Sequence, residues 1–199
     1  MQIAAAILAG GKATRLGGIA KGTLLDNSGC SIVARLIEQI TAAGIADIVI
    51  SANDARPYQV LNRPIIADRQ AGIGPLGGIE AVLTELAPRV DCVLFLPCDL
   101  PNITAAEILR LVQTYEASPR VVAFAYSAQG DHPLCAVVPA TALSAVTAAI
   151  ASGKYGVGRL WRSLAARPVE IEDEARLLNI NTPEDLRDWR NSSKHDHSG

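Results

Sequence analysis

Residues 3–21 of the chain read IAAAILAGGKATRLGGIAK. The apolar run Ile3–Leu8 predicts a β-strand, and the segment that follows it carries four glycines and three basic side chains, Lys12, Arg15 and Lys21. Glycine lets backbone N–H groups approach an anion closely, and the bases neutralise the charge that those amides leave over. A surface turn with solvated bases is the alternative, but a strand that leads directly into glycines and bases favours a polyphosphate site.

The glycine-rich segment differs from the two common phosphate-binding loops. A Walker loop ends in Gly-Lys-Ser/Thr, whereas Gly153-Lys154 is followed here by Tyr155, and the three-glycine dinucleotide fingerprint is absent from the segment. The segment instead resembles the signature Leu-Ala-Gly-Gly-x-x-x-Arg-Met-Gly-x-x-x-Lys of the nucleotidyltransferase superfamily, with Leu16 in place of Met. The resemblance implies that the polyphosphate belongs to a nucleotide.

Composition bounds the class of protein. A chain of 199 residues suits one domain that buries about 70% of its unfolded surface. A net charge of −2 and an aromatic content of 4% argue against nucleic acid as a partner. No apolar run reaches the roughly 18 residues of a membrane span, and no leader opens the chain. We therefore expect a cytoplasmic protein without nucleic-acid or membrane partners, with one domain over residues 1–190 and a polar, disordered tail over residues 191–199.

The cysteines give little sign of metal or thiol chemistry. The four cysteines, Cys30, Cys92, Cys98 and Cys135, are scattered, without Cys-x-x-Cys or histidines at ligand spacing. Cys92 and Cys135 lie in apolar runs, where a free thiol behaves as a small hydrophobe. Cys98 precedes an aspartate of interest, so a catalytic thiol there is the weaker alternative.

Strand and helix patterns alternate along the chain. Strands are predicted at Ile3–Leu8, Asp47–Ser51, Pro64–Ala67, Cys92–Leu96, Val121–Tyr126 and Leu134–Val138. Helices are predicted at Ser31–Ala43, Ile79–Leu86, Thr104–Tyr115, Ala140–Ala151 and Val157–Leu164, and from Thr182 onward. This alternation indicates an α/β fold, a three-layer α/β/α sandwich with a mostly parallel central sheet. The last two strands would suit an antiparallel pair, which the sequence leaves open.

Ligands of such sheets bind beyond the carboxyl ends of the strands. The loops after Leu8, Ser51, Ala67 and Leu96 should therefore line one crevice. Asp99 follows the buried strand in Pro97-Cys98-Asp99-Leu100-Pro101, and a carboxylate opposite a phosphate loop suits Mg²⁺. A turn before Thr104 is the alternative role of Asp99.

Three further features point into the same crevice. Asp68 ends the third predicted strand, and Asn53 follows the second, where it would bind a ribose or base or make a turn. The second glycine-rich stretch, residues 72–78, is expected to be a loop that lies against a ligand or serves as a plain connector.

Five motifs make the resemblance specific. They are Leu8-Ala9-Gly10-Gly11, Gly74-Pro75-Leu76-Gly77-Gly78, Pro97-Cys98-Asp99, Asp131-His132-Pro133 and Asn179-Ile180-Asn181-Thr182-Pro183-Glu184. They occur in the same order as in the molybdenum cofactor guanylyltransferases, the MobA-like nucleotidyltransferase family, and they span nearly the whole chain. The resemblance implies a Rossmann-like nucleotidyltransferase fold and transfer of GMP from GTP to the terminal phosphate of molybdopterin, with release of pyrophosphate.

The resemblance also assigns residues. The catalytic set would be Arg15, Lys21 and Asp99, with Asp99 holding Mg²⁺. The nucleotide would be bound by Leu8, Ala9, Gly10, Gly11, Lys21, Asn53, Asp68 and Asp99. The acceptor side would comprise Asp131, His132, Pro133, Asn179 and Asn181. The implied partners are GTP and molybdopterin, and the resemblance is compatible with cofactor insertion proteins or molybdoenzyme chaperones as well.

Other functions stay open at this point. Cytidylyl relatives show Leu-Ala-Ala-Gly and Gly-Asp-Met-Pro where this chain has Gly11 and Pro97-Cys98-Asp99, which favours the guanylyl pattern. The alternatives are a molybdopterin cytidylyltransferase, a sugar-phosphate nucleotidyltransferase and a nucleotide-binding protein without catalysis. One departure lies at Gly156-Val157-Gly158, where family members often carry further arginines, so the acceptor contacts there are the least defined.

Overall fold

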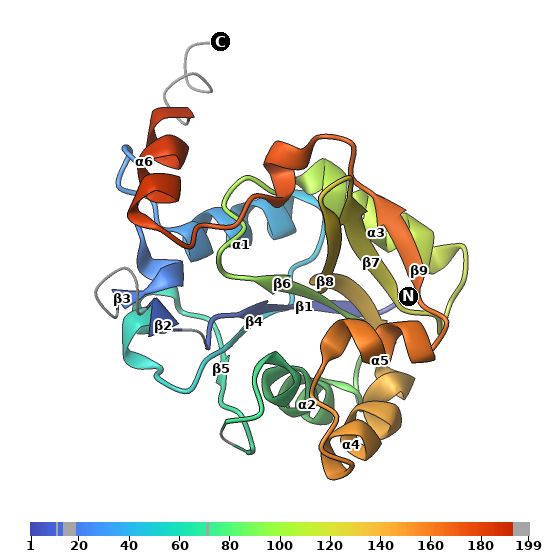
Figure 1. The fold of residues 1–199 in the computed structure, drawn as a ribbon. Coiled ribbons are helices and arrows are strands. Elements are labelled where there is room, and N and C mark those ends of the chain that lie inside the picture. The colour runs from blue at the N-terminus through green and yellow to red at the C-terminus, as the bar shows by residue number, and fades with distance from the viewer. Residues whose placement is uncertain (11, 14–18, 71, 193–199) are drawn as a thin grey trace.

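The structure is a computed structural model, and it describes residues 1–10, 12–13, 19–70 and 72–192. Within these residues, seven strands form one sheet (Figure 1). Its strands, in spatial order, are β5 (Ile65–Ile66), β4 (Ile48–Ser51), β1 (Ile3–Leu8), β6 (Cys92–Pro97), β8 (Gly130–Pro139), β7 (Ala123–Ser127) and β9 (Arg167–Glu170). A separate two-stranded ribbon is formed by β2 (Lys12–Ala13) and β3 (Ile19–Ala20).

The sheet is mostly parallel, as expected from the sequence. β5, β4, β1 and β6 pair in parallel, and β7 pairs in parallel with β9. β8 lies between β6 and β7 and runs antiparallel to both, which settles the strand pair that the sequence left open. β8 begins at Gly130 rather than Leu134, and β9 was not expected at all.

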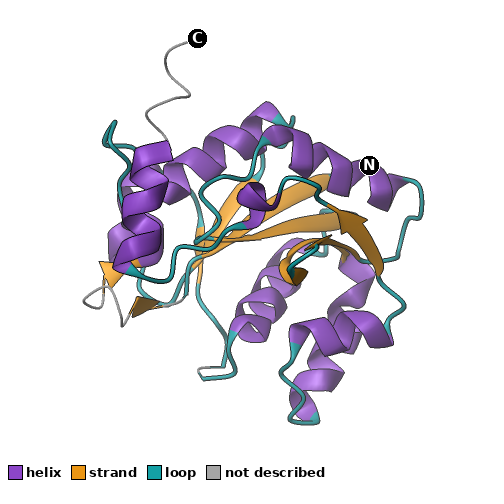
Figure 2. Ribbon diagram, turned by 45° about the horizontal axis from the view of Figure 1, so that its top comes forward, coloured by secondary structure: helices purple, strands orange, loops and turns teal. Residues whose placement is uncertain are grey.

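Helices cover both faces of the sheet (Figure 2). One face is covered by α1 (Ile32–Ala42) and α3 (Ala105–Glu116), with Trp189 of α6 (Pro183–Ser192) in the same core. The other face is covered by α2 (Pro75–Leu86), α4 (Leu143–Ala151) and α5 (Val157–Ser163). The predicted three-layer α/β/α sandwich is therefore confirmed. The short helical turns are η2 (Lys21–Thr23), η3 (Arg56–Leu61), η4 (Ala140–Ala142) and η5 (Glu174–Leu177).

The central strands read as continuous apolar runs because both of their faces are covered. In β1, Ala5 and Ile7 pack in the core of α1 and α3, whereas Ala4 and Ala6 pack in the core of α2. The same alternation places Leu94 with the first core and Phe95 with the second. These strands cannot slip by one residue without exchanging the two sets of side chains.

Two helices start where local capping chemistry predicts, and one starts earlier than expected. α3 begins with the capping box formed by Thr104 and Glu107, and α6 begins at Pro183 after Thr182, both as expected. α2, however, begins at Pro75 rather than Ile79. The expectation that residues 72–78 form a loop is therefore wrong from Pro75 onward.

The glycines of α2 serve close packing. A Cβ added to Gly78 would lie 2.6 Å from the Ser51 hydroxyl and 3.4 Å from a methyl group of Leu8. Gly74 has a φ of +69°, a conformation that glycine adopts at little cost, and this turn directs the chain into the helix. The first turn of α2 consequently lies against the ends of β1 and β4.

The remaining differences are at element boundaries. η4 precedes α4 where one continuous helix was expected, and α6 extends through Ser192, so that Asn191 and Ser192 are helical rather than part of a tail. Residues 193–199 lie outside the described residues. Within the described residues, no helix has both the length and the apolar character that crossing a bilayer requires.

A buried carboxylate shapes the turn between η2 and α1. Asp26 accepts hydrogen bonds from the backbone N–H groups of Ser28 and Cys30 and from the Ser28 hydroxyl, at 2.7–2.9 Å. Its other oxygen pairs with Arg35 at 3.0 Å, and the Asp26 side chain is 1% exposed. Burial alone would raise the pKa of Asp26, but the hydrogen bonds outweigh it and hold the pKa below its ordinary value of 3.8.

Replacement of this carboxylate should therefore destabilise the fold in a pH-dependent way. We expect Asp26→Asn to lower the free energy of unfolding by about 1–3 kcal/mol at neutral pH, because a buried charged hydrogen-bond network is broken. A lowered folded-state pKa stabilises the protein above the unfolded pKa, and this stabilisation is lost as the pH falls through the folded value. The difference between the variant and the wild type should thus shrink at acidic pH in urea unfolding.

Asp54→Asn is the matched control. Asp54 also pairs with an arginine, Arg56, but both side chains are at least half exposed. We expect its effect to stay below about 1 kcal/mol at every pH. Equal effects of the two substitutions would contradict the role assigned to Asp26.

Candidate active site

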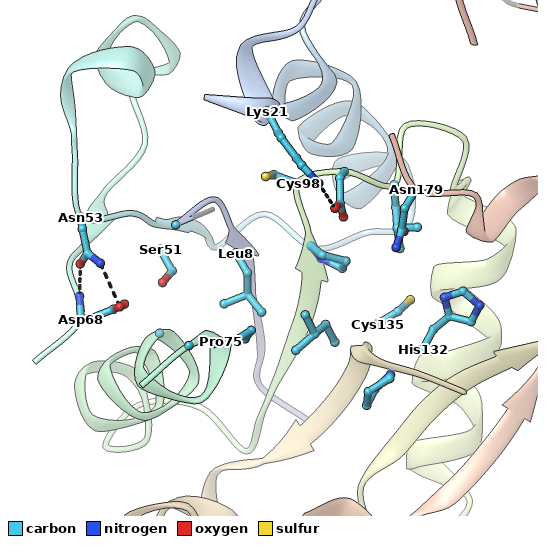
Figure 3. A pocket seen from close by; sticks show the side chains of 18 of the residues that line it. Leu8, Lys21, Ser51, Asn53, Asp68, Pro75, Cys98, His132, Cys135 and Asn179 are labelled. Carbon is cyan, nitrogen blue, oxygen red and sulfur yellow. Dashed lines mark hydrogen bonds and ion pairs between the residues drawn. The ribbon is translucent and has the colours of Figure 1, made fainter. Parts of the chain in front are cut away.

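A cleft of about 590 Å³ opens at the carboxyl ends of β1, β4 and β6 (Figure 3). Leu8, Ser51 and Pro97, which end these three strands, all line it. Segments that follow strands, together with the start of β8, contribute the other sequence-predicted residues that face the cleft, which are Gly10, Lys21, Asn53, Asp68, Asp99, Asp131, His132, Pro133 and Asn179. The crevice expected from the strand order is therefore present, and β8 adds a wall that the strand order did not predict.

Backbone hydrogen bonds hold the strand exits in register. The Cys98 N–H donates to the Leu8 carbonyl at 3.0 Å, and the Ala9 N–H donates to the Ser51 carbonyl at 2.8 Å. The ladder between neighbouring strands thus continues one residue beyond β1 and β6. This continuation places Gly10 and Asp99 beside the same edge of the sheet.

Lys21 and Asp99 form an ion pair in the middle of the cleft. The Lys21 ammonium Nζ lies 3.0 Å from Asp99 Oδ2, with side-chain exposures of 17% and 18%. The same ammonium donates to Asn181 Oδ1 at 2.6 Å, and the Ile180 N–H donates to the Asp99 carbonyl at 3.0 Å. A segment close to the C-terminus thus fixes both partners of the pair, and a dashed line at Lys21 marks the ion pair in Figure 3.

Asn53 and Asp68 form a second pair at one end of the cleft (Figure 3). The Asn53 amide donates to Asp68 Oδ2 at 2.9 Å, and the Asp68 N–H donates to Asn53 Oδ1 at 2.8 Å. The Ser51 hydroxyl and the Cα of Gly78 lie next to this pair. The reciprocal bonds fix the orientation of both side chains at the cleft.

The opposite end of the cleft is formed by β8 and the segment that contains Asn179 (Figure 3). Asp131 forms an ion pair with Arg162 of α5, and the Trp161 indole N–H donates to the Pro133 carbonyl at 2.8 Å. Burial lowers the pKa of His132, and the charge of Asp131 opposes this only in part. His132 is consequently a neutral imidazole at neutral pH.

Some predicted site residues are placed differently. Ala9 is buried, and its carbonyl accepts a hydrogen bond from the Tyr58 hydroxyl at 3.4 Å. Asn181 reaches the cleft only through Lys21. Gly11 and Arg15 lie outside the described residues.

The structure also adds residues that sequence reasoning missed. Ser51, Leu100 and Leu134 line the cleft, and Arg162 forms an ion pair with Asp131. No local signal marked Arg162, because it lies within α5 and its partner Asp131 is 31 residues away in the chain. The apolar residues gave none, because they look like any strand or helix end.

Comparison with known proteins identifies the family. The MobA-like NTP transferase domain matches residues 5–169. This chain belongs to the MobA-like NTP transferase family. The molybdenum cofactor guanylyltransferase of Mannheimia succiniciproducens is 33% identical over 189 residues, which cover 94% of this chain and 97% of that protein. That of Pseudomonas fluorescens is 32% identical over 181 residues, with 89% and 88% covered.

Solved structures show the same fold at low sequence identity. Molybdopterin-guanine dinucleotide biosynthesis protein A from Archaeoglobus fulgidus superposes with a TM-score of 0.76 at 20% identity, over 96% of this chain and 98% of that one. CMP:2-keto-3-deoxy-manno-octonic acid synthetase complexed with CTP superposes with a TM-score of 0.79 at 14% identity, over 98% and 100%. The nucleotidyltransferase fold expected from the resemblance is therefore confirmed.

The donor set of this MobA-like site suits a metal that arrives with its substrate. Among the residues that the structure describes, no three His, Cys, Asp or Glu side chains are grouped closely enough to hold a metal ion. Mg²⁺ needs only one or two carboxylates when phosphate oxygens and water complete its shell. Asp99, partly exposed at the cleft, fits this mode of binding.

Cys98 does not suit nucleophilic chemistry. Burial raises the pKa of the Cys98 thiol to about 12, and the neighbouring Asp99 charge adds to the effect. The thiol is therefore protonated at neutral pH, and only the thiolate is a good nucleophile. The alternative role that the sequence left open for Cys98 is not supported by its surroundings.

Thiol labelling tests this conclusion. We expect iodoacetamide to modify at most Cys30 in the native protein, because Cys92, Cys98 and Cys135 are all buried and their pKa values are raised to about 12. All four cysteines should react after unfolding, as mass spectrometry of peptides would show. Rapid labelling of Cys98 in the native protein would contradict the assignment.

Proposed function

We propose that this chain transfers the GMP part of GTP to the terminal phosphate of molybdopterin, forming the guanine dinucleotide cofactor and releasing pyrophosphate. The observation that carries the proposal is the Lys21–Asp99 pair, which stands between two different walls of one cleft. A nucleotidyltransferase needs such an arrangement. The nucleotide binds on one side and the acceptor on the other, and charged groups between them stabilise the reacting phosphates. Relatives named as molybdenum cofactor guanylyltransferases align over most of the chain and supply the identity of both substrates.

The nucleoside side is assigned to Asn53 and Asp68. Their mutual hydrogen bonds pre-orient an amide and a carboxylate, groups that suit the hydroxyls of a ribose or the donors of a base. Leu8 and the first turn of α2 form the apolar surface beside them. Gly10 would cradle phosphate oxygens with its backbone N–H, because a residue without a side chain permits close approach. The roles of Gly11 and Arg15 rest on the sequence resemblance.

The charge of the cleft favours a nucleotide that brings a cation. Asp68, Asp99 and Asp131 line the cleft, and Lys21 is the only Lys or Arg among its described lining residues. A triphosphate next to these described residues therefore meets more carboxylates than bases. A bound Mg²⁺ would supply positive charge that offsets the negative charge of the phosphates. Asp99 would hold the ion, and Lys21 would turn its ammonium toward the phosphates.

The acceptor needs positioning rather than deprotonation. A phosphate monoester is already mostly dianionic near neutral pH, since its second pKa is about 6. No general base is required, which agrees with a neutral His132 and a protonated Cys98 beside the cleft. Asp131, His132, Pro133, Asn179 and Asn181 form the proposed acceptor side. Catalysis then rests on alignment and on electrostatic stabilisation.

A reaction that consumes GTP would take place in the cytoplasm. Its product would pass to proteins that insert the cofactor into molybdoenzymes.

The test of the proposal is pyrophosphate release from GTP with and without molybdopterin. Release that depends on molybdopterin supports a transferase. Binding of GTP without any release would indicate a nucleotide-binding protein instead.

Asp99→Asn should lower turnover by at least about 100-fold in this assay, the scale of losing one preorganised electrostatic group. The substitution keeps the size of the side chain and removes only its charge. Asp91→Asn is the matched control, because Asp91 precedes the same strand at its far end and accepts a hydrogen bond from the Gln2 N–H. Equal turnover of the Asp99 variant and the wild type would remove the metal assignment.

Nucleotide preference separates the proposal from cytidylyl transfer. We expect Mg·GTP to raise the thermal midpoint of the protein more than Mg·CTP at the same concentration. A ligand at 100 times its Kd stabilises the native state by about 2.7 kcal/mol, so a difference in affinity is readily seen. A larger shift with CTP would favour the cytidylyltransferase, and a shift with a sugar 1-phosphate would favour the sugar-phosphate enzyme.

A further inference from the structure

Tyr58 is a buried tyrosine outside the cleft wall described above. It lies in η3, between β4 and β5, and only 1% of its surface is exposed. A phenol at this depth is expected to have hydrogen-bond partners, because burying an unpaired hydroxyl is unfavourable. The partners of Tyr58 belong to three separate segments, and each of them adjoins a residue of the proposed site.

The first two partners are the two ends of the glycine-rich segment. The Tyr58 hydroxyl donates to the Ala9 carbonyl at 3.4 Å, and it accepts a hydrogen bond from the Gly22 N–H that lowers the pKa of the phenol against the stronger effect of burial. A hydroxyl can donate and accept at once, so a single oxygen joins both ends. Ala9 precedes Gly10, and Gly22 follows Lys21.

The third neighbour is Cys98, which precedes Asp99. The Cys98 thiol raises the pKa of the Tyr58 phenol, and the Gly22 N–H, as a hydrogen-bond donor, lowers the pKa of both groups. The phenol, the thiol and the Gly22 amide therefore form one buried cluster. In the sequence, two members of this cluster adjoin the ion pair, since Gly22 follows Lys21 and Cys98 precedes Asp99.

Gly22 shows how close this packing is. A Cβ at Gly22 would lie 2.4 Å from a methyl group of Val33 and 3.1 Å from the Tyr58 hydroxyl oxygen. Any side chain there would push η2 away from α1 and η3. The absence of a side chain lets the backbone next to Lys21 rest on the phenol.

We propose that Tyr58 is a positioning residue whose hydroxyl ties Ala9 to Gly22 and so sets the reach of Lys21 and Gly10 toward the phosphates. The proposal rests on the proposed nucleotide site and adds a residue to it that does not touch the substrate. A phenyl ring would fill the same space, so the hydroxyl alone carries the role. Small displacements of groups that align a reaction lower its rate strongly.

Tyr58→Phe, which removes only the hydroxyl, is the test, and Tyr115→Phe is the matched control. Tyr115 is also buried, and its hydroxyl donates to the Asp91 carbonyl at 3.5 Å, before the start of β6 and away from the cleft. We expect Tyr58→Phe to lower kcat/KM for GTP by about 10- to 100-fold and to leave the KM for molybdopterin unchanged. Tyr115→Phe should leave both values unchanged. This should hold even if the two variants have similarly lowered thermal midpoints, so that a general loss of stability does not explain the kinetic effect.

Two measurements without acceptor separate this inference from the proposed function. The Kd for Mg·GTP should rise in Tyr58→Phe and not in Tyr115→Phe, and hydrogen exchange of peptides that cover residues 19–24 should be faster only in Tyr58→Phe. Wild-type binding and exchange in Tyr58→Phe would overturn the inference and leave the proposed function intact. A wild-type protein that binds no GTP would overturn the proposed function, whereas unchanged exchange at residues 19–24 would by itself refute the positioning role of Tyr58.

Discussion

The ion pair of Lys21 and Asp99 is the contact on which the site depends, because it joins two segments that lie 78 residues apart in the chain. Neither residue lies in a long helix or in a strand of the sheet. Asp99 follows β6 and is fixed through the pairing of β6 with β1 and through the Ile180 N–H. Lys21 opens a short turn that can approach only because Gly22 lacks a side chain. The pair is partly shielded from water, so its attraction is screened less than that of a surface pair.

Much of the fold follows from patterns that are local in the sequence. Cys92–Leu96 is apolar at every position because helices cover both faces of β6, and this leaves little choice but a buried strand. Thr104 and Glu107 satisfy backbone groups at the start of α3 without help from other segments. Such elements could be predicted because their causes lie within a few residues.

The wrong predictions arise where packing overrides local preference. Gly77 and Gly78 signal a loop by propensity, yet they are buried in a helix that must lie close to Ser51 and Leu8. β9 was missed because it is an edge strand in which only Val169 is buried, and its second residue is a proline. A four-residue edge strand gives no apolar period to detect.

For the site, the sequence could predict which residues gather but not how they pair. Asn53, Asp68 and Asp99 were expected in one crevice because parallel strands direct their carboxyl ends to one edge of the sheet. The contact of Lys21 with Asn181 spans 160 residues, and the pair of Asp131 with Arg162 crosses from β8 to α5. Nothing local to either partner indicates such contacts, because they follow from the relative placement of whole elements.

The segment before α6 shows how a helix cap can serve a site at the same time. The Asp185 carboxylate accepts hydrogen bonds from the N–H groups of Asn181 and Thr182 at 2.8 Å, and these bonds lower its pKa. The cap therefore fixes the backbone of Asn181, whose side chain holds Lys21, while the Lys21 charge in turn lowers the pKa of Asp185. Because Asn179 lines the cleft two residues earlier, the proposed acceptor side and the Lys21–Asp99 pair share one backbone anchor. A shift of this anchor would therefore displace Asn179 and Lys21 together.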